Sequence, residues 1–202
     1  MDRLKKIINY LSLEEFLNAI THGIGAVLAV VGFVALIIEA YLNGGKWHLV
    51  SFLIYGISLI LLYVASTLYH SFKNEKIKGY LKIFDHSAIY LLIAGNYTPF
   101  VLVPLHGVLG WSIFGIVWGM ALIGIVFKLF FAKRFKFIST ICYLIMGWFA
   151  VVMIKPLLAS LPIGAIYWLL LGGAFYTIGS VFYLIKRIPY NHVIWHLFVL
   201  AG

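Results

Sequence analysis

Residues 17–42, LNAITHGIGAVLAVVGFVALIIEAYL, are apolar on every side of a helix rather than along one stripe. A helix that crosses a bilayer needs about 20 predominantly apolar residues, and this stretch is long enough. The whole chain has the same character, with 64% hydrophobic residues, 10% charged residues and a mean hydropathy of +1.06. A water-soluble protein of 202 residues typically has fewer apolar and more charged residues than this. The sequence therefore predicts an integral membrane protein.

Six more apolar runs follow the first, at roughly 48–72, 83–103, 108–127, 137–154, 163–185 and from 190 to the end. The breaks between them are short and carry turn or charge signals, at 43–45, 73–82, 104–107, 133–136, 156–162 and 186–189. The pattern predicts an all-α bundle of six or seven spans that forms one domain over residues 1–202. The last run has only about a dozen residues before Gly202, short of the roughly 20 needed to cross. We expect either that the native product continues or that this helix stops within the bilayer.

Lysine and arginine are distributed unevenly between alternate breaks. The N-terminus and every second loop after it hold 13 of the 15 basic residues, and the other loops hold only Lys46 and Lys155. Because cytoplasmic loops carry an excess of basic residues, this predicts a cytoplasmic N-terminus in a plasma-membrane protein. The net charge of +9 suits anionic lipid headgroups. The basic residues lie at the ends of the apolar runs, where they form a ring that we call the basic collar. They do not form one patch, which argues against nucleic-acid binding. The apolar run after Lys5 and Lys6 is too long for a cleavable signal, so we expect the first segment to remain in the mature protein.

Five polar side chains fall inside or at the ends of the apolar runs: Ser66, His70, Asp85, His192 and His196. Ionisable residues in membrane segments are costly, and they usually face a bundle interior and mark a functional site. The two last histidines are four residues apart, and so are the serine and the first histidine, which places each pair on one helix face. Three imidazoles and a carboxylate are typical of a metal site. Cys142 is the only cysteine, so thiolates cannot supply the ligands.

These residues also lie at a similar depth in the membrane. His70 comes three residues before Lys73, and Asp85 comes three residues after Lys82, on helices that run in opposite directions. At 1.5 Å per residue both lie roughly 4 to 5 Å inside the basic collar. His192 begins the last apolar run, five residues beyond the final basic residue. Residues from three spans therefore meet at one level, toward the cytoplasmic side.

Simpler interpretations exist for each residue. A single histidine in a membrane helix often hydrogen-bonds to a neighbouring helix. Ser66 can serve close helix packing or bond to its own backbone, and Asp85 can cap a helix or pair with Lys82. The shared depth and the number of ligands favour the metal site over these alternatives.

The remaining histidines and acids have secondary roles in this interpretation. His86 is adjacent to Asp85 and about 100° around the helix, so we expect it to support the site or to pack. Glu15, Asn18 and His22 lie on one helical stripe, which predicts a supporting polar network. Two further histidines, His48 and His106, are expected at the opposite membrane surface.

Four motifs resemble the haemolysin III family: Glu15-x-x-Asn18-x-x-Thr21-His22-x-x-Gly25, Ser66-Thr67-Leu68-Tyr69-His70, the run from Phe84 to Phe100 (FDHSAIYLLIAGNYTPF), and His192-x-x-Trp195-His196. That family is grouped with the progestin and adiponectin receptors and with alkaline ceramidases. The resemblance covers nearly the whole chain and implies a seven-helix bundle with a zinc ion near the cytoplasmic side. By motif position, His70, His192 and His196 are the implied zinc ligands, Asp85 is expected to hold the zinc-bound water, and Ser66 is expected to line the site.

Three functions remain open from the sequence. The first is a zinc-dependent hydrolase of a lipid amide or ester, because three imidazoles leave a coordination position open. In that case membrane lipids are the partners, and a lipid-like substrate enters between helices. The second is a sensor or regulator of membrane state in which zinc is structural. The third is a pore-forming haemolysin, which is disfavoured because no row of charged residues lines a polar path.

Overall fold

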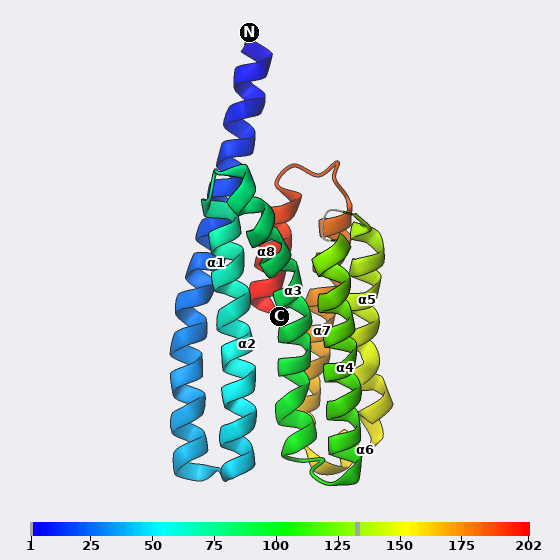
Figure 1. Ribbon diagram of the computed structural model, residues 1–202. Coiled ribbons are helices and arrows are strands. Elements are labelled where there is room, and N and C mark those ends of the chain that lie inside the picture. The colour runs from blue at the N-terminus through cyan, green and yellow to red at the C-terminus, as the bar shows by residue number, and fades with distance from the viewer. Residues whose placement is uncertain (1, 132–133) are drawn as a thin grey trace.

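The chain folds into a bundle of long helices that run up and down beside one another (Figure 1). The computed structural model describes residues 2–131 and 134–202. Helix α1 (Asp2–Asn43) is joined to α2 (Lys46–Ser71) by the two glycines of the first predicted break. Helix α3 (Glu75–Leu102) follows, then α4 (Val108–Phe131). The predicted all-α bundle is therefore confirmed.

The fifth long segment is interrupted. Helix α5 (Lys136–Trp148) passes into the 3-10 helix η1 (Phe149–Met153), and α6 (Ile154–Ser160) continues the same segment. Helix α7 (Ile163–Leu184) returns, and the short α8 (Asn191–Ala201) ends the chain. Helix α8 packs against both α7 and α1, which closes the bundle. A side chain at Gly179 of α7 would collide with Phe198 and Trp195 of α8, so the small residue permits this close contact.

Five segments within the described residues are long and apolar enough to cross a membrane, namely Tyr10–Asn43, Lys46–Ser71, Val108–Phe131, Lys136–Ser160 and Ile163–Leu184. The chain is thus a multi-pass membrane protein, but the predicted third and seventh spans are not among the five. Helix α3 has the length, at 28 residues. It contains many polar groups, however, and packs between α2 and α4, where the protein covers them. Helix α8 is apolar but has only 11 residues.

Two predicted breaks are shorter than expected. The break at 73–82 is confined to residues 72–74, because Asn74 caps α3 by accepting hydrogen bonds from the backbone N–H groups of Lys76 and Ile77. The break that we placed from Pro156 is also displaced, since α6 continues to Ser160. Pro156 lies in the first turn of α6, where its missing N–H group is not needed for the helix. Lys133, part of the fourth predicted break, lies outside the described residues.

The basic loops all lie at the end of the bundle from which the N-terminal helix projects (Figure 1). The connections α2–α3, α4–α5 and α7–α8 are at this end, whereas Lys46 and Lys155 lie in elements at the other. His70 falls in the last turn of α2 and His192 in the first turn of α8. The predicted ligands are therefore all close to the basic end.

Candidate metal centre

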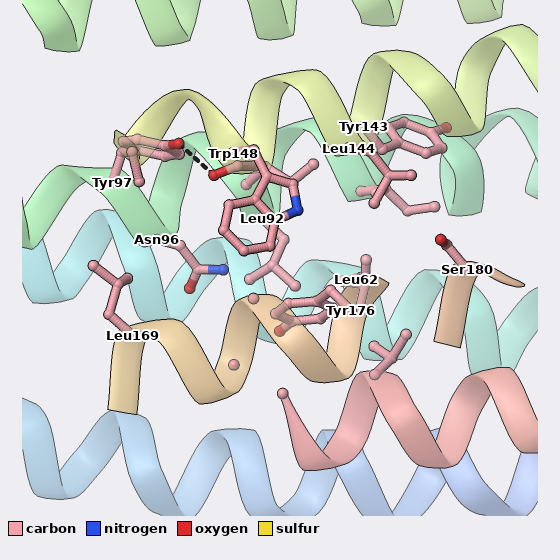
Figure 2. A pocket seen from close by; sticks show the side chains of 18 of the residues that line it. Leu62, Leu92, Asn96, Tyr97, Tyr143, Leu144, Trp148, Leu169, Tyr176 and Ser180 are labelled. Carbon is pink, nitrogen blue, oxygen red and sulfur yellow. Dashed lines mark hydrogen bonds between the residues drawn. The ribbon is translucent and has the colours of Figure 1, made fainter. Parts of the chain in front are cut away.

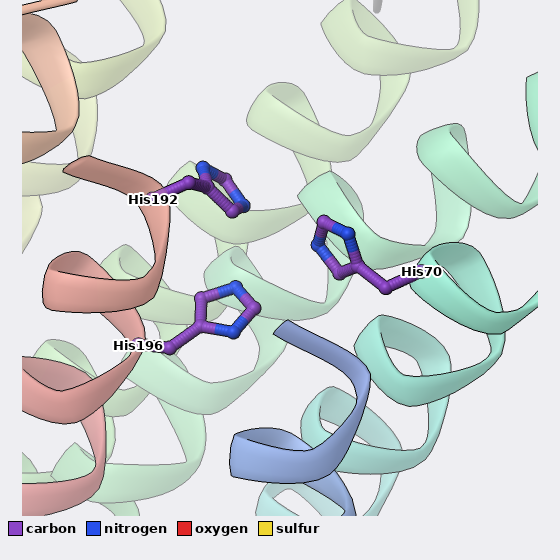
Figure 3. Close-up of side chains that lie close together, drawn as sticks. All are labelled: His70, His192 and His196. Atoms are coloured by element: carbon purple, nitrogen blue, oxygen red, sulfur yellow. The ribbon is translucent and has the colours of Figure 1, made fainter. Parts of the chain in front are cut away.

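Three histidines from two helices face one another inside the bundle. His70 comes from α2, and His192 and His196 come from successive turns of α8 (Figure 3). One ring nitrogen of each lies within 4.8 Å of one nitrogen of both others. His70 and His196 are buried, and His192 is partly buried. The structure thus brings together the three ligands predicted from sequence.

The distances fit a metal ion with little adjustment. A tetrahedral zinc ion with bonds of about 2.0 to 2.1 Å separates its ligand nitrogens by roughly 3.3 Å. The three nitrogens, all within 4.8 Å of one another, would have to approach by up to about 1.5 Å to reach that spacing. The His70 Nε2 atom is buried and has no hydrogen-bond partner among the described residues. Buried polar atoms are rarely without a partner, so this nitrogen beside two other imidazoles is suited to bind a cation.

Glu15 on α1 fixes the orientation of the His70 ring. Its Oε2 atom lies 3.1 Å from His70 Nδ1 and 2.7 Å from Lys78 Nζ. With Nδ1–H donating to the carboxylate, Nε2 is left free for a metal. Lys78 belongs to the first turns of α3, so this single carboxylate ties three helices together at the site.

The His196 ring is held by the next turns of α1. His196 Nδ1 lies 3.3 Å from the backbone oxygen of Asn18 and 3.2 Å from Thr21 Oγ1. Donation from Nδ1–H to the Asn18 carbonyl leaves Nε2 for the metal, as at His70. The ring of His22 stacks on the His196 ring, with centroids 3.5 Å apart and planes 9° from parallel. The predicted stripe of Glu15, Asn18 and His22 therefore lies against two of the three candidate ligands.

A cavity of about 640 Å³ opens beside the triad. His22, Ser66, Asp85, His192 and His196 are among the side chains that line it, whereas His70 is not. The rest of its wall is formed by apolar and aromatic side chains from α2, α3, α5 and α7, among them Leu62, Leu92, Tyr97, Leu144, Trp148, Leu169 and Tyr176 (Figure 2). A metal at the triad would thus lie beside a space whose mainly apolar lining suits a lipid chain.

Asp85 lines this cavity but does not belong to the group of converging ligand atoms. Its Oδ2 atom lies 3.6 Å from His86 Nδ1. His86 is not among the converging ligand atoms either: Nδ1 lies 2.7 Å from the Lys82 carbonyl, and the Tyr183 hydroxyl lies 3.4 Å from Nε2. His86 thus connects α3 to α7, in agreement with the supporting or packing role expected for it.

Sequence reasoning missed two supporting residues. Thr21 belongs to the quoted motif, and its position four residues before Gly25 on the same helix gave no sign of a contact with His196. Lys78 was assigned to a loop, because its neighbours are polar and charged. Only the cap at Asn74, which starts α3 early, places Lys78 on a helix beside Glu15.

The fold and the site define a class: a multi-pass helical membrane protein with a buried three-histidine site that can hold a metal ion. The sequence profile of the family described as Haemolysin-III related matches residues 10–202. The chain belongs to this haemolysin III family, as its motifs predicted.

Relatives of known name agree with this assignment. The chain is 54% identical to the hemolysin-3 homolog of Bacillus subtilis, over 94% of this chain and 89% of the relative. It is 51% identical to hemolysin-3 of Bacillus cereus, over 94% and 86%. It is also 29% identical to the human monocyte to macrophage differentiation factor, over 92% and 78%. No solved structure gives a significant match.

Proposed function

We propose that the chain is a zinc-dependent hydrolase that cleaves an amide or ester bond of a lipid inside the membrane. The observation that carries the proposal is the shared space: His192 and His196 of the triad, Ser66 and Asp85 all line one cavity whose other walls are mainly apolar. Zinc held by three histidines supplies a Lewis acid with an open coordination position. We infer zinc as the metal of this site because the three ligands are all imidazoles, a donor set that suits zinc among the common biological metals.

The protein's own residues then have separate roles in the reaction. Water adds to the acyl carbon, the C–N or C–O bond breaks, and a carboxylic acid and an amine or alcohol are released. Asp85 accepts a proton from the attacking water and returns it to the leaving group. The Ser66 hydroxyl donates a hydrogen bond to the oxygen that becomes negatively charged. The apolar wall holds the acyl chain and excludes bulk water.

The proposal includes an orientation. The basic loops at the N-terminal end favour the cytoplasmic side for that end. The triad then lies near the cytoplasmic leaflet of the plasma membrane. A lipid of that leaflet can reach the cavity by moving sideways between helices, with membrane lipids as the partners.

The structural-zinc sensor shares the triad but has no use for the cavity residues. A zinc ion that only joins helices needs no carboxylate beside an open position. The pore-forming alternative, suggested by the name of the Bacillus cereus relative, is less well supported, because the cavity wall is mainly apolar and offers no polar path.

The test compares Asp85→Asn with wild type for zinc content and product release in the same preparations. The panel contains ceramides, simpler acyl amides and the matched esters. We expect Asp85→Asn to keep its zinc, because Asp85 is outside the ligand group, and to lose roughly 10²- to 10⁴-fold in turnover, the usual contribution of a general base. Glu39→Gln is the matched control: Glu39 bonds to Asn43 at the far end of α1. Zinc-loaded wild type that hydrolyses no lipid in the panel would favour the sensor.

A further inference from the structure

His22 is a buried imidazole whose hydrogen-bonding capacity is unused. It is 3% exposed, and neither ring nitrogen has a partner among the described residues. Its faces are occupied, by the stacked His196 ring on one side and by the edge-on Tyr63 ring at 5.1 Å. The stacking holds the ring plane in place, and His22 lines the cavity. A neutral imidazole has one donor and one acceptor, and neither is used within the described residues.

Ser66 has the same property, and it is an exception on its helix. The other serine and threonine side chains of α2 each donate to the carbonyl four residues earlier, at 2.5 to 2.7 Å: Ser51, Ser58, Thr67 and Ser71. Ser66 is 1% exposed, and its Oγ atom has no partner among the described residues. It also lines the cavity. Because buried polar groups are almost always hydrogen-bonded, Ser66 and His22 require a partner that enters the cavity.

The two residues come from adjacent helices, His22 from α1 and Ser66 from α2, and both line the same cavity. Tyr63, whose ring contacts His22, precedes Ser66 by three residues and therefore lies on the same face of α2. Both groups are neutral, one being an imidazole and the other a hydroxyl. A neutral partner that both donates and accepts a hydrogen bond satisfies them better than an ion does. The smallest such partner is an O–H group.

We propose that His22 and Ser66 bind a hydroxyl group of the lipid whose chain occupies the cavity: the lipid O–H donates to Ser66 Oγ and accepts from the His22 ring N–H, so the Ser66 proton remains for the oxygen that becomes negatively charged. The inference rests on the proposed binding of a lipid beside the metal and adds a site that selects among lipids. A site that hydrogen-bonds a hydroxyl discriminates strongly against an analogue that lacks it, because the protein groups are then left unpaired. The selection falls on lipids with a free hydroxyl near the cleaved bond.

The test measures binding of two probes to the zinc-loaded full chain in detergent. The probes are 1-dodecanol and its methyl ether, which has the same chain and an oxygen that accepts but cannot donate. We expect wild type to bind the alcohol roughly 10-fold more tightly, the effect of one good hydrogen bond. His22→Phe, which keeps the stacked ring, and Ser66→Ala are each expected to lose most of this preference. Ser58→Ala is the matched control, since that buried hydroxyl is bonded to the Ile54 carbonyl.

The results also separate the possible sources of the O–H group. Equal binding of alcohol and ether by wild type means that water alone fills the site, and it overturns the proposal. If both variants keep the preference for the alcohol, the alcohol binds elsewhere, for example at the metal. This result also overturns the proposal. If His22→Phe does not fold, Ser66→Ala decides. An alcohol preference that depends on both residues, in a protein without hydrolytic activity, supports this site and refutes only the proposed reaction.

Discussion

His70 and His196 are held by acceptors of different strength. His70 faces the Glu15 carboxylate, whereas His196 faces a backbone carbonyl, that of Asn18. A hydrogen bond to a charged acceptor is roughly twice as strong as one between neutral groups, and it makes the imidazole a more basic ligand. Of the two contacts, we therefore expect Glu15 to contribute more to metal affinity.

Replacing Glu15 by glutamine should weaken zinc binding. The amide keeps the size of the side chain but removes the charge that orients and polarises His70, and such supports are typically worth 10- to 100-fold in metal affinity. Titration against a competing chelator measures the change. Glu39→Gln on the same helix should leave the affinity unaltered, because its partner is Asn43 at the other end. Unchanged affinity in Glu15→Gln would mean that the 3.1 Å contact does not act on the metal.

The candidate ligands could be predicted because their spacing along a helix is a local property. His192 and His196 must share a face of α8, and the basic collar sets their depth. The stacking of His22 on His196 could not be predicted, since it depends on how α1 and α8 pack across the bundle. The same holds for the unpaired Ser66 hydroxyl, which only the shape of the cavity explains.

Helix α8 is the helix that a metal at the triad would stabilise most. It has 11 residues, and it supplies two of the three candidate ligands. Isolated helices of this length are marginal in water, so contacts with the rest of the protein must stabilise it. A zinc ion that joins His70 to α8 adds a direct link between α2 and α8.

Removal of zinc should therefore loosen α8 selectively. We expect amide hydrogen exchange in α8 to rise on chelation, while exchange in α4, which carries no candidate ligand, stays the same. Mass spectrometry of peptides from both helices measures this in one sample. A uniform rise across the bundle, or none in α8, would contradict the role of the metal as a link between α2 and α8.

The interruption at η1 is stabilised from α3. The Tyr97 hydroxyl donates to the carbonyls of Met146 and Gly147, at 2.8 and 2.7 Å, just where α5 ends (Figure 2). Backbone carbonyls at a helix end need partners inside a membrane protein, because water is not available to them. Tyr97 provides that partner while lining the cavity.

Tyr97→Phe should lower the free energy of unfolding by about 1 to 3 kcal/mol, the cost of leaving buried carbonyls unpaired. Thermal unfolding in detergent measures the loss. Tyr167→Phe is the control, because Tyr167 is 65% exposed. If both variants unfold at the temperature of wild type, the hydrogen bonds to the end of α5 contribute nothing measurable.

The elements that sequence predicted well are those with long apolar runs and clear ends. The interruption of the fifth segment could not be predicted, because α5, η1 and α6 form one apolar run and differ only in backbone hydrogen bonding. The early start of α3 was missed because Lys76, Lys78 and Lys82 suggested a loop. These residues are helical because the cap at Asn74 starts α3 before its apolar run begins.

At the scale of the whole molecule, charge is segregated between the two ends of the bundle. One end carries the N-terminus and the basic loops, and the other carries Lys46 and Lys155. The proposed orientation follows from this difference. It also sets the leaflet from which a lipid reaches the cavity.

Single cysteines on a Cys142→Ser background should report this orientation. A cysteine at the exposed position Lys76 should react with an impermeant reagent only from the cytoplasmic side, and one at Lys46 or Lys155 only from outside. Labelling intact cells and inverted vesicles in parallel distinguishes the sides. Reaction at Lys76 in intact cells would reverse the orientation and place the triad near the outer leaflet.

Metal analysis of the purified protein shows whether His70, His192 and His196 hold one zinc ion. We predict about one zinc per chain in wild type, on the basis of a single triad. Replacement of any of the three histidines by alanine should lower this content sharply, whereas His106→Ala, an exposed histidine bonded to the Leu102 carbonyl, should keep it. Full zinc content in the three triad variants, or a wild type that binds none, would contradict the account.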